Sequence, residues 1–274
     1  MPELPEVETI VRDLRPLLVG RRILGIEVSK KPLRRKWSRA WNASIIGRSA
    51  NAIGRRGKWI LIDLGEPWLL VHLGMTGQFT VAPADVSRAS HTHLVFHLDD
   101  GNELRFRDIR RFGSAALFPN RAKLDGHLAT MRLGPEPFEL EASAFHASLR
   151  ATNRNLKAIL LDQTVIAGVG NIYADESTFE AGLHPTTIGK RVRADQAANL
   201  CRAIVSVLTH AIEKRGASIR DYVGGSGLKG GFQDEFRVYG RTGEPCIQCA
   251  TPIERIVLGG RSTHYCPTCQ PKRG

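Results

Sequence analysis

Four cysteines near the C-terminus restrict the possible folds of this chain more than any other feature. They form two Cys-x2-Cys pairs, Cys246 with Cys249 and Cys266 with Cys269, separated by 16 residues. Two such pairs at this separation are typical of a zinc ribbon, in which each pair supplies two thiolates to one tetrahedral ion. Two disulfides are the alternative, but disulfides suit secreted proteins. We therefore predict one Zn²⁺ ion. Four sulfur ligands fill its coordination shell and leave no open position for catalysis, so its role is structural.

The first half of the chain has the pattern of a β-rich domain behind an N-terminal helix. Apolar residues recur at helical spacing just after Pro5, and short strands with a hairpin at Asp100-Gly101 follow. Regular short strands imply a β-sandwich or barrel. Residues 121–143 contain prolines and are expected to be an irregular linker. The expected strands are 23–28, 59–64, 68–73, 78–81, 93–98, 103–107 and 115–118.

The second half of the chain is predicted to be helical. We expect helices over residues 155–163 and 172–181, and a longer one that ends at Gly216. The fifth cysteine, Cys201, lies in the apolar stripe of the long helix and is expected in the core. The glycine-rich residues 224–231 that follow suit either a mobile loop that orders on a ligand or a plain linker.

The charge of the chain indicates a polyanionic partner. Its 274 residues carry a net charge of +12, and residues 21–58 hold 12 basic residues against one acid, Glu27. So unequal a balance favours a surface that follows phosphates over a merely solvated basic face. An anionic membrane is the rival partner, but the sequence has no long apolar run, signal peptide or lipidation motif. We expect a soluble, intracellular protein.

The first six residues, Met1-Pro2-Glu3-Leu4-Pro5-Glu6, allow two interpretations. Prolines and acids collect at helix starts, so they suit a simple helix N-terminus. Alternatively, removal of Met1 leaves Pro2 with a secondary α-amine, whose reference pKa of about 7.7–8.0 keeps part of it uncharged at neutral pH. Such an amine attacks an aldehyde-like carbon to give an iminium ion, and Glu3 lies close enough in sequence to move protons.

Two further segments have residues that suit phosphates and bases. Gly168-Val169-Gly170-Asn171 precedes a predicted helix, and backbone N–H groups there can approach a phosphate, although a tight turn is the plainer explanation. Arg110-Arg111-Phe112-Gly113 connects predicted strands and sets an aromatic ring beside two guanidinium groups. Such a loop can wedge between bases, or it can be a cation–π cluster on the surface.

Two single residues have an ordinary and a functional interpretation. Met75 lies on the tight turn of Leu73-Gly74-Met75-Thr76-Gly77, where filling of the core is the default expectation. Lys58 starts a predicted strand, and its ordinary interpretation is a solvated surface lysine.

Taken together, these motifs resemble the bacterial formamidopyrimidine-DNA glycosylases, which remove oxidised purines such as 8-oxoguanine. The resemblance runs along the whole chain, through MPELPEVET, GRRGKWILIDL, HLGMTGQF, DIRRFG, LGPEP, GVGNIYADE, VYGRTGEPC and the four cysteines. It implies an α+β multidomain protein: an N-terminal β-sandwich with an N-terminal helix, a helix–two-turns–helix domain and a C-terminal zinc ribbon. The corresponding ranges are residues 1–130, a linker over 131–143, 144–236 and 237–274.

The resemblance also implies roles for single residues. Pro2 is similar to the nucleophile that attacks C1′ of the damaged nucleotide, and Glu3 to the acid/base that assists base loss and ring opening. Lys58 resembles a lysine that contacts phosphate near the lesion and assists catalysis. Arg261, at the tip of the ribbon hairpin, corresponds to a phosphate-binding arginine implicated in the second elimination.

A second set of residues is similar to those with which the family binds DNA. Met75, Arg110 and Phe112 resemble the trio that fills the void left by an extruded base, with Arg110 facing the orphan cytosine. Residues 218–236 match the loop that closes over the flipped base, although they are unusually rich in glycine here. The full predicted DNA-binding set is Met75, His91, Arg110, Phe112, Arg154, Lys157 and Asn171.

The resemblance implies a bifunctional glycosylase and lyase whose partner is double-stranded DNA with oxidised bases. We expect a bacterial, cytoplasmic monomer that has no membrane partner. Two other classes stay open at this point. An endonuclease VIII-type enzyme for oxidised pyrimidines would share the architecture, but that class typically has glycine where this chain has Leu4. A zinc-ribbon DNA-binding protein without catalysis would not need Pro2, Glu3 and Lys58.

Overall fold

The computed structural model describes residues 1–218 and 223–272, and the chain divides into two compact units. Unit 1 comprises Met1–Met131 and Lys214–Gln233, and unit 2 comprises Arg132–Glu213 and Asp234–Gly274. The sequence prediction assigned residues 144–236 to one helical domain. Contacts with the N-terminal helix group the segment Lys214–Gln233 with unit 1, and the predicted domain bounds stay a prediction.

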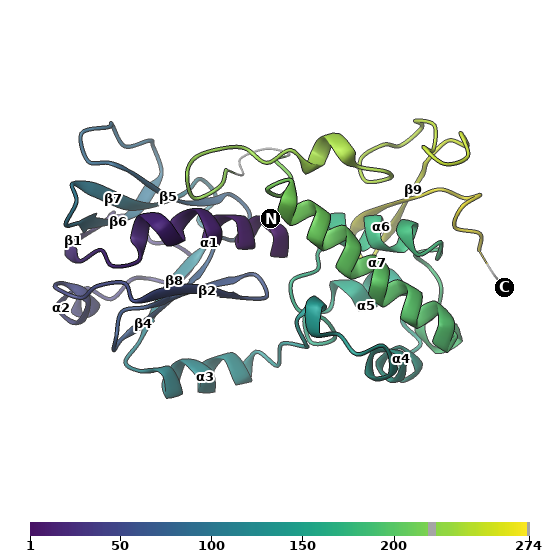
Figure 1. The fold of residues 1–274 in the computed structure, drawn as a ribbon, viewed down its shortest axis with the longest axis horizontal. Coiled ribbons are helices and arrows are strands. Elements are labelled where there is room, and N and C mark those ends of the chain that lie inside the picture. Colours follow the sequence, from purple (N-terminus) through teal and green to yellow (C-terminus); the bar gives the residue numbers. More distant parts are fainter. Residues whose placement is uncertain (219–222, 273–274) are drawn as a thin grey trace. The chain divides into compact units, whose positions relative to one another are not determined.

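Unit 1 is built on two four-stranded antiparallel sheets, ordered β1-β6-β7-β5 and β2-β3-β4-β8 (Figure 1). Apolar residues of both sheets pack into one core, as expected of a β-sandwich. The strands of the first sheet are β1 (Ile23–Val28), β5 (Gly77–Pro83), β6 (Thr92–Leu98) and β7 (Asn102–Asp108). The strands of the second sheet are β2 (Ala52–Arg56), β3 (Trp59–Asp63), β4 (Trp68–His72) and β8 (Ser114–Phe118).

Strand β2 is not predicted by the sequence pattern, whereas the seven other strands of unit 1 are. Arg55 and Arg56 interrupt any apolar alternation, so the segment looks like a polar loop. It forms a strand because it pairs with β3 from Ala52 opposite Asp63 to Arg56 opposite Trp59. The Arg55 side chain, which is only 9% exposed, pairs with Glu8 of the N-terminal helix at 3.1 Å.

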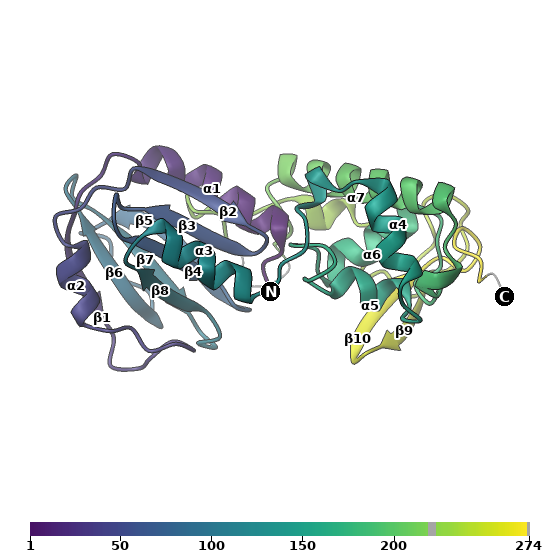
Figure 2. The ribbon, with the colours of Figure 1, turned by 90° about the horizontal axis from the view of Figure 1, so that it is seen from below.

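Helix α1 (Leu4–Leu18) closes the edge of the sandwich that β2 and β5 form (Figures 1 and 2). Its apolar face, with Val7, Ile10 and Leu14 fully buried, packs into the core between the sheets. The helix begins with a capping box, in which Glu3 and Glu6 each accept a hydrogen bond from the other's backbone N–H. The chain terminus is therefore attached to the core at the start of α1.

Helix α3 (Arg121–Thr130) corrects the prediction that residues 121–143 are irregular. The Asn120 side chain caps the helix by accepting from the N–H of Lys123. Leu124 is fully buried against the outer face of the second sheet, beside Trp68 and Phe118. Gly126 weakens the helical pattern in the sequence, so this helix depends on packing against the sheet rather than on propensity. A second short helix of unit 1 is α2 (Ala40–Ile45).

The described part of the glycine-rich segment folds back onto α1. Asp13 of α1 accepts hydrogen bonds from Arg215, at 2.7 Å, and from the hydroxyl of Ser226, at 3.0 Å. The carbonyl of Gly225 accepts from the N–H of Val81 in β5. Of the lesion-covering loop expected over 218–236, residues 219–222 lie outside the described residues.

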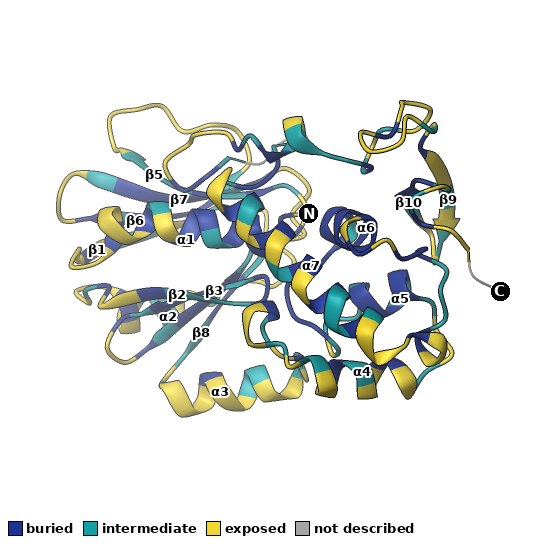
Figure 3. Cartoon of the chain, turned by 45° about the vertical axis from the view of Figure 1, so that its right-hand side comes forward, coloured by how far each residue is buried: buried dark blue, intermediate teal, exposed yellow. Residues whose placement is uncertain are grey.

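Helix α6 (Asn171–Glu180) of unit 2 packs against α5 (Leu156–Leu161) and α7 (Ala194–Glu213), and its residues Ile172–Phe179 are all buried (Figure 3). In α7, burial raises the pKa of Cys201 to about 11, so this thiol stays protonated in the core as expected. Unit 2 also contains α4 (Ala142–Arg150) and the 3₁₀ turns η1 (Pro137–Glu139) and η2 (Gly189–Arg191), whereas the 3₁₀ turn η3 (Phe232–Glu235) begins in unit 1 and ends in unit 2.

Unit 2 ends in a two-stranded antiparallel hairpin, β9 (Glu254–Leu258) and β10 (Arg261–Tyr265). Gly259 and Gly260 form its turn with positive φ angles of 54° and 72°, which glycine adopts without strain. Together with the four cysteines, this hairpin confirms the predicted zinc ribbon and completes the predicted α+β fold. Within residues 1–218 and 223–272, no helix has the length and apolar character needed to cross a membrane.

Candidate active site and metal centre

The N-terminus of unit 1 is held by the carboxylate of Glu6. Its Oε2 atom accepts the backbone N–H of Glu3 at 2.8 Å, and its Oε1 atom accepts the N–H of Ala217 at 2.8 Å. Pro2 is buried and Glu3 is only 3% exposed. A carboxylate with two backbone donors is a firm anchor, because both of its oxygens are used. The candidate nucleophile Pro2 and acid/base Glu3 therefore lie on a fixed section of backbone.

Lys58 lies in the tight turn between β2 and β3. Gly57 has a positive φ of 55°, and its carbonyl accepts a hydrogen bond from the guanidinium of Arg55 at 3.0 Å. The Lys58 residue is only 6% exposed, which is unusual for a lysine. It is thus not the solvated lysine of the ordinary interpretation.

His72, at the end of β4, is a half-buried base near Lys58. Its Nδ1 atom accepts the N–H of Gly74 at 3.1 Å. Burial, together with the positive charges of Lys58 and Arg34, lowers the pKa of His72 to about 4. The imidazole is therefore neutral at neutral pH, and Lys58 and Arg34 are the cations of this region.

We expect the protein to become less stable as the pH falls below 6.5, because of His72. The unfolded chain binds a proton at His72 near pH 6.5 and the folded chain only near pH 4. The stabilisation is therefore complete above pH 6.5 and decreases as the pH falls toward 4, by about 2 kcal/mol after allowance for solvent screening. The variant His72→Asn keeps an acceptor for Gly74 and cannot titrate. Its free energy of unfolding should fall less steeply over this interval in urea titrations; parallel curves would contradict the assignment.

The three predicted wedge residues lie together at the tips of two loops. Met75 is 42% exposed and Phe112 is 45% exposed. The Arg110 guanidinium lies 4.6 Å from the centre of the Phe112 ring, and its Nη1 atom is 3.2 Å from the sulfur of Met75. Gly74 allows this approach, because a Cβ atom there would lie 2.5 Å from the backbone of Phe112. The result is an exposed tip with two apolar side chains and one cation.

His91 is exposed at the turn before β6 and has a positive φ of 69°. Its carbonyl accepts the N–H of Asp108 at 2.9 Å, which connects this turn to the end of β7. A positive φ is uncommon in a residue other than glycine and marks a conformation that its surroundings impose. The imidazole is thereby presented on a fixed turn.

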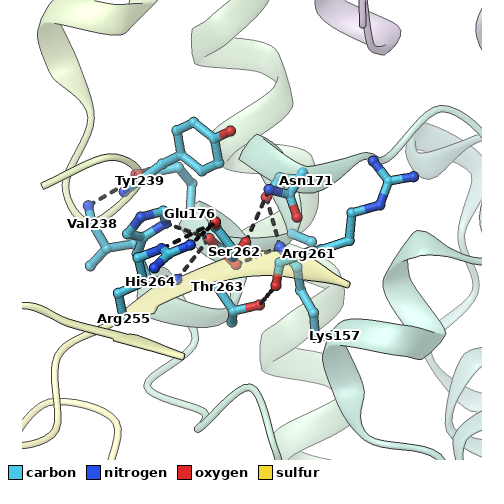
Figure 4. A network of polar contacts seen from close by, with 12 residues as sticks. Lys157, Asn171, Glu176, Val238, Tyr239, Arg255, Arg261, Ser262, Thr263 and His264 are labelled. Carbon is cyan, nitrogen blue, oxygen red and sulfur yellow. Dashed lines mark hydrogen bonds and ion pairs between the residues drawn. The ribbon is translucent and has the colours of Figure 1, made fainter. Parts of the chain in front are cut away.

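In unit 2, the start of α6 is joined to the zinc-ribbon hairpin (Figure 4). The Asn171 side chain donates from Nδ2 to the carbonyl of Ser262 at 3.0 Å, and its Oδ1 atom is buried without a partner in the described part of the chain. Arg261, the residue before Ser262, is exposed. Two predicted phosphate-binding residues from distant parts of the sequence are therefore neighbours beside a helix N-terminus, which favours anions.

Lys157 is fully buried, which differs from what a direct contact with DNA would require. Its Nζ atom lies 2.5 Å from Oδ1 of Asp175 and donates to the carbonyl of Asn171 at 2.8 Å. The other oxygen of Asp175 accepts the backbone N–H of His264 at 2.9 Å. This ion pair connects α5, α6 and β10 and places Lys157 against the backbone of Asn171, and the predicted DNA contact of Lys157 stays a prediction.

Removal of the Lys157 charge is expected to destabilise unit 2. The variant Lys157→Met leaves the Asp175 carboxylate buried without its cation, and breaking such a pair costs about 3–5 kcal/mol. The matched control Lys190→Met changes an exposed lysine of the same unit and should cost less than about 0.5 kcal/mol. Urea unfolding measures both. A Lys157→Met variant of unchanged stability, with a reduced salt dependence of DNA binding, would instead support a direct DNA contact.

Arg154 lies at the surface before α5 and is paired with Asp162 at 2.6 Å. Its side chain is 46% exposed, so the guanidinium can exchange this partner for a phosphate at low cost. The expected DNA contact of Arg154 stays a prediction.

The four cysteines of the ribbon form a metal centre. Their sulfur atoms all lie within 4.8 Å of one another, and three pairs are separated by 3.5 to 3.8 Å. A tetrahedron with Zn–S bonds of about 2.3 Å has edges of about 3.8 Å, so the sulfur positions fit Zn²⁺. The cluster confirms the predicted ligands Cys246, Cys249, Cys266 and Cys269 and holds the ribbon in shape.

Three buried carboxylates that support these sites are missing from the sequence prediction. Glu6 holds the N-terminus, Asp175 joins α6 to the ribbon, and Glu176 accepts the backbone N–H groups of residues 237–239. Burial raises the pKa of Glu176 from its ordinary value. Only Glu6 has a recognisable sequence pattern, since it occupies position N3 of the capping box that begins at Glu3.

Comparison with known protein families accounts for nearly the whole chain. The "Formamidopyrimidine-DNA glycosylase N-terminal domain" matches residues 1–115, and the "Formamidopyrimidine-DNA glycosylase H2TH domain" matches residues 133–223. The "Zinc finger found in FPG and IleRS" matches residues 243–272. These three matches follow the order of the β-sandwich, the helices and the ribbon.

Individual relatives match over their full length. The formamidopyrimidine-DNA glycosylase of Solibacter usitatus is 46% identical to this chain. The alignment covers 99% of this chain and 100% of that protein. That of Desulforamulus reducens is 42% identical over 98% of this chain and 99% of its own length. Among solved structures, Lactococcus lactis Fpg with DNA that contains an abasic site has a TM-score of 0.92 and 34% identity, covering 98% of this chain and 100% of its own.

A second solved structure, Lactococcus lactis Fpg with DNA that contains Fapy-dG, has a TM-score of 0.90 and 33% identity, with coverage of 98% and 100%. Identities above 40% over complete chains, together with three matching domains in order, leave one assignment. This chain belongs to the formamidopyrimidine-DNA glycosylase family.

Proposed function

We propose that this protein excises oxidised purines, 8-oxoguanine and formamidopyrimidines, from duplex DNA and then cuts the strand at the same site. The observation that carries the proposal is the anchored N-terminus, where Glu6 holds the backbone of Glu3 and Ala217 so that Pro2 is buried at the start of α1. After removal of Met1 the Pro2 nitrogen is a secondary amine, whose reference pKa of about 7.7–8.0 leaves part of it uncharged and nucleophilic at neutral pH.

The reaction begins at C1′ of an extruded nucleotide. The Pro2 nitrogen forms a bond to C1′ and gives up its N–H proton, and the glycosidic bond breaks with its electron pair on the departing base, which takes up a proton. The bond from C1′ to the ring oxygen then opens, with Glu3 donating a proton to that oxygen. The product is an iminium ion, which is an electron sink next to C2′.

Two eliminations follow from the iminium ion. Loss of a proton from C2′ breaks the C3′–O bond, and a second elimination breaks the C5′–O bond. Water then hydrolyses the iminium and releases Pro2. The proposal predicts a one-nucleotide gap with phosphate at both ends. Separate groups must move these protons because base loss and elimination need them at different atoms.

The cations of both units support the proposal as phosphate contacts. Lys58 in unit 1 and Arg261 in unit 2 each suit a phosphate, and the Asn171 side chain is bonded to Ser262 next to Arg261. Met75, Arg110 and Phe112 suit the space left by the extruded base, which offsets an unstacking cost of a few kcal/mol. The neighbours in the solved structures carry damaged DNA, which supports the same partner here.

One set of duplexes tests the proposal. The protein should excise 8-oxoguanine opposite cytosine far faster than thymine glycol, and electrophoresis should show phosphate at both ends of the gap. Preference for thymine glycol would instead indicate the pyrimidine-specific class. Binding that weakens steeply with salt but never cuts DNA would indicate a binding protein without catalysis.

A further inference from the structure

The buried carboxylate of Asp108 joins the loops that carry the wedge residues. Asp108 is the last residue of β7 and is 0% exposed. Its Oδ1 atom accepts the hydroxyl of Thr76 at 2.5 Å, and its Oδ2 atom accepts the N–H of Gly113 at 2.7 Å. Thr76 belongs to the loop of Met75, and Gly113 follows Phe112. One carboxylate therefore holds both loops.

The hydroxyl of Thr76 extends this connection to Arg110. While its hydrogen is donated to Asp108, its oxygen accepts the backbone N–H of Arg110 at 3.0 Å. A hydroxyl has one hydrogen and two lone pairs, so a single Thr76 side chain can make both bonds at once. Arg110 is thus held from the neighbouring loop and not only by its own strand.

The backbone of Asp108 adds a third segment. Its N–H donates to the carbonyl of His91 at 2.9 Å, and its carbonyl lies 3.0 Å from Nε2 of His93. A carbonyl only accepts, so Nε2 of His93 is the donor. The turn with His91 and the two wedge loops therefore share one buried residue.

We propose that Asp108, with Thr76, is a positioning residue that sets the three wedge side chains as one rigid tip, and so controls base extrusion and the choice of the opposite base. The inference rests on the proposed function of Met75, Arg110 and Phe112. Asp108 is buried and holds other groups, so it acts through the loops and takes no part in the chemistry at C1′. Loss of the connection should impair extrusion more than cutting of a site that has already lost its base.

The variant Thr76→Val tests the connection without placing a new group in the core. It nearly preserves the shape of the side chain and removes both hydrogen bonds. Thr76→Ser restores the hydroxyl, and Thr80→Val makes the same change further along β5 at a residue outside these contacts. Asp108→Asn is a second test. Its amide N–H group replaces one acceptor oxygen and would face either the Thr76 hydroxyl or the Gly113 N–H, so one of the two hydrogen bonds of the carboxylate is lost.

The first measurement needs no DNA. Amide hydrogen exchange at Arg110 and Gly113 should accelerate about tenfold or more in Thr76→Val and Asp108→Asn, respectively, since each loses a hydrogen bond. Thr76→Ser and Thr80→Val should exchange like the parent protein. Unchanged exchange in both test variants would overturn the positioning role, whether or not the enzyme excises 8-oxoguanine.

The second measurement compares substrates under single-turnover conditions. Thr76→Val should excise 8-oxoguanine opposite cytosine about 30-fold more slowly, with cutting at a preformed abasic site changed by less than about threefold. Its preference for cytosine over adenine opposite the lesion should fall about tenfold, and Thr76→Ser should recover it. A parallel loss on both substrates would show a purely structural effect and contradict the inference. A parent protein that excises no 8-oxoguanine would refute the proposed function instead.

Discussion

An N-terminal extension that keeps the Pro2 nitrogen in an amide is expected to abolish base excision and strand cutting. An amide nitrogen has no basic lone pair and cannot form an iminium ion, so the rate should fall by about 1,000-fold or more. The contacts of Glu6 with Glu3 and Ala217 involve backbone N–H groups that the extension leaves in place. Affinity for DNA with an abasic-site analogue should therefore change by less than about threefold.

The matched control carries the same extension after Gly274 and should keep full activity. Single-turnover rates on 8-oxoguanine opposite cytosine measure the effect, and intact mass confirms that Met1 is absent from the control and the extension present in the variant. An extended protein that works at the parent rate would remove Pro2 from the mechanism. Loss of DNA binding along with activity would show that the extension obstructs the DNA rather than the chemistry.

Loss of a zinc ligand should have the second-largest effect, on DNA binding. Metal binding to a structural four-cysteine site contributes about 10–16 kcal/mol in small zinc domains, so Cys249→Ser should unfold the ribbon. The hairpin then no longer presents Arg261, and the bond from Asn171 to Ser262 is lost. Affinity for damaged DNA should fall about 100-fold or more, because two phosphate contacts and their alignment disappear together.

Cys201→Ala is the control for this experiment, since Cys201 is a core thiol away from the cluster. It should keep one zinc per chain by elemental analysis and bind DNA as the parent does, with a modest loss of stability. Unit 1 has its own core, so the β-rich part of Cys249→Ser should still unfold cooperatively. A Cys249→Ser protein that binds one zinc and DNA normally would contradict the assigned metal centre.

The elements that could be predicted are those whose own residues carry a regular pattern. Seven strands of unit 1, the apolar stripe of α1 and the Cys-x2-Cys pairs each have a local signature. Strand β2 and helix α3 do not. The first depends on pairing with β3, and the second on packing of Leu124 against the outer face of a sheet. Tertiary contacts determine both.

In the candidate site, too, residues with a sequence motif could be predicted, whereas tertiary contacts could not. Four candidate site residues are recognisable from sequence motifs, because their residue types suit the proposed chemistry directly: Pro2, Lys58, Arg110 and Asn171. The contacts that hold them are not: Glu6 bonds to Ala217, which is 211 residues away, and Asp108 bonds to Thr76 across two loops. For Lys157, motif reasoning and burial point to different roles. A lysine beside a DNA-binding motif suggests a phosphate contact, whereas the fold buries it against Asp175.

The most direct test of the central claim is to find the atom that carries the DNA after reduction. The protein is incubated with 8-oxoguanine DNA and borohydride, the trapped complex is digested, and the modified peptide is sequenced by mass spectrometry. We predict that the sugar remnant lies on the nitrogen of Pro2, in a peptide that lacks Met1. A remnant on Lys58 or another lysine, or full activity of a chain that still carries Met1, would contradict the account.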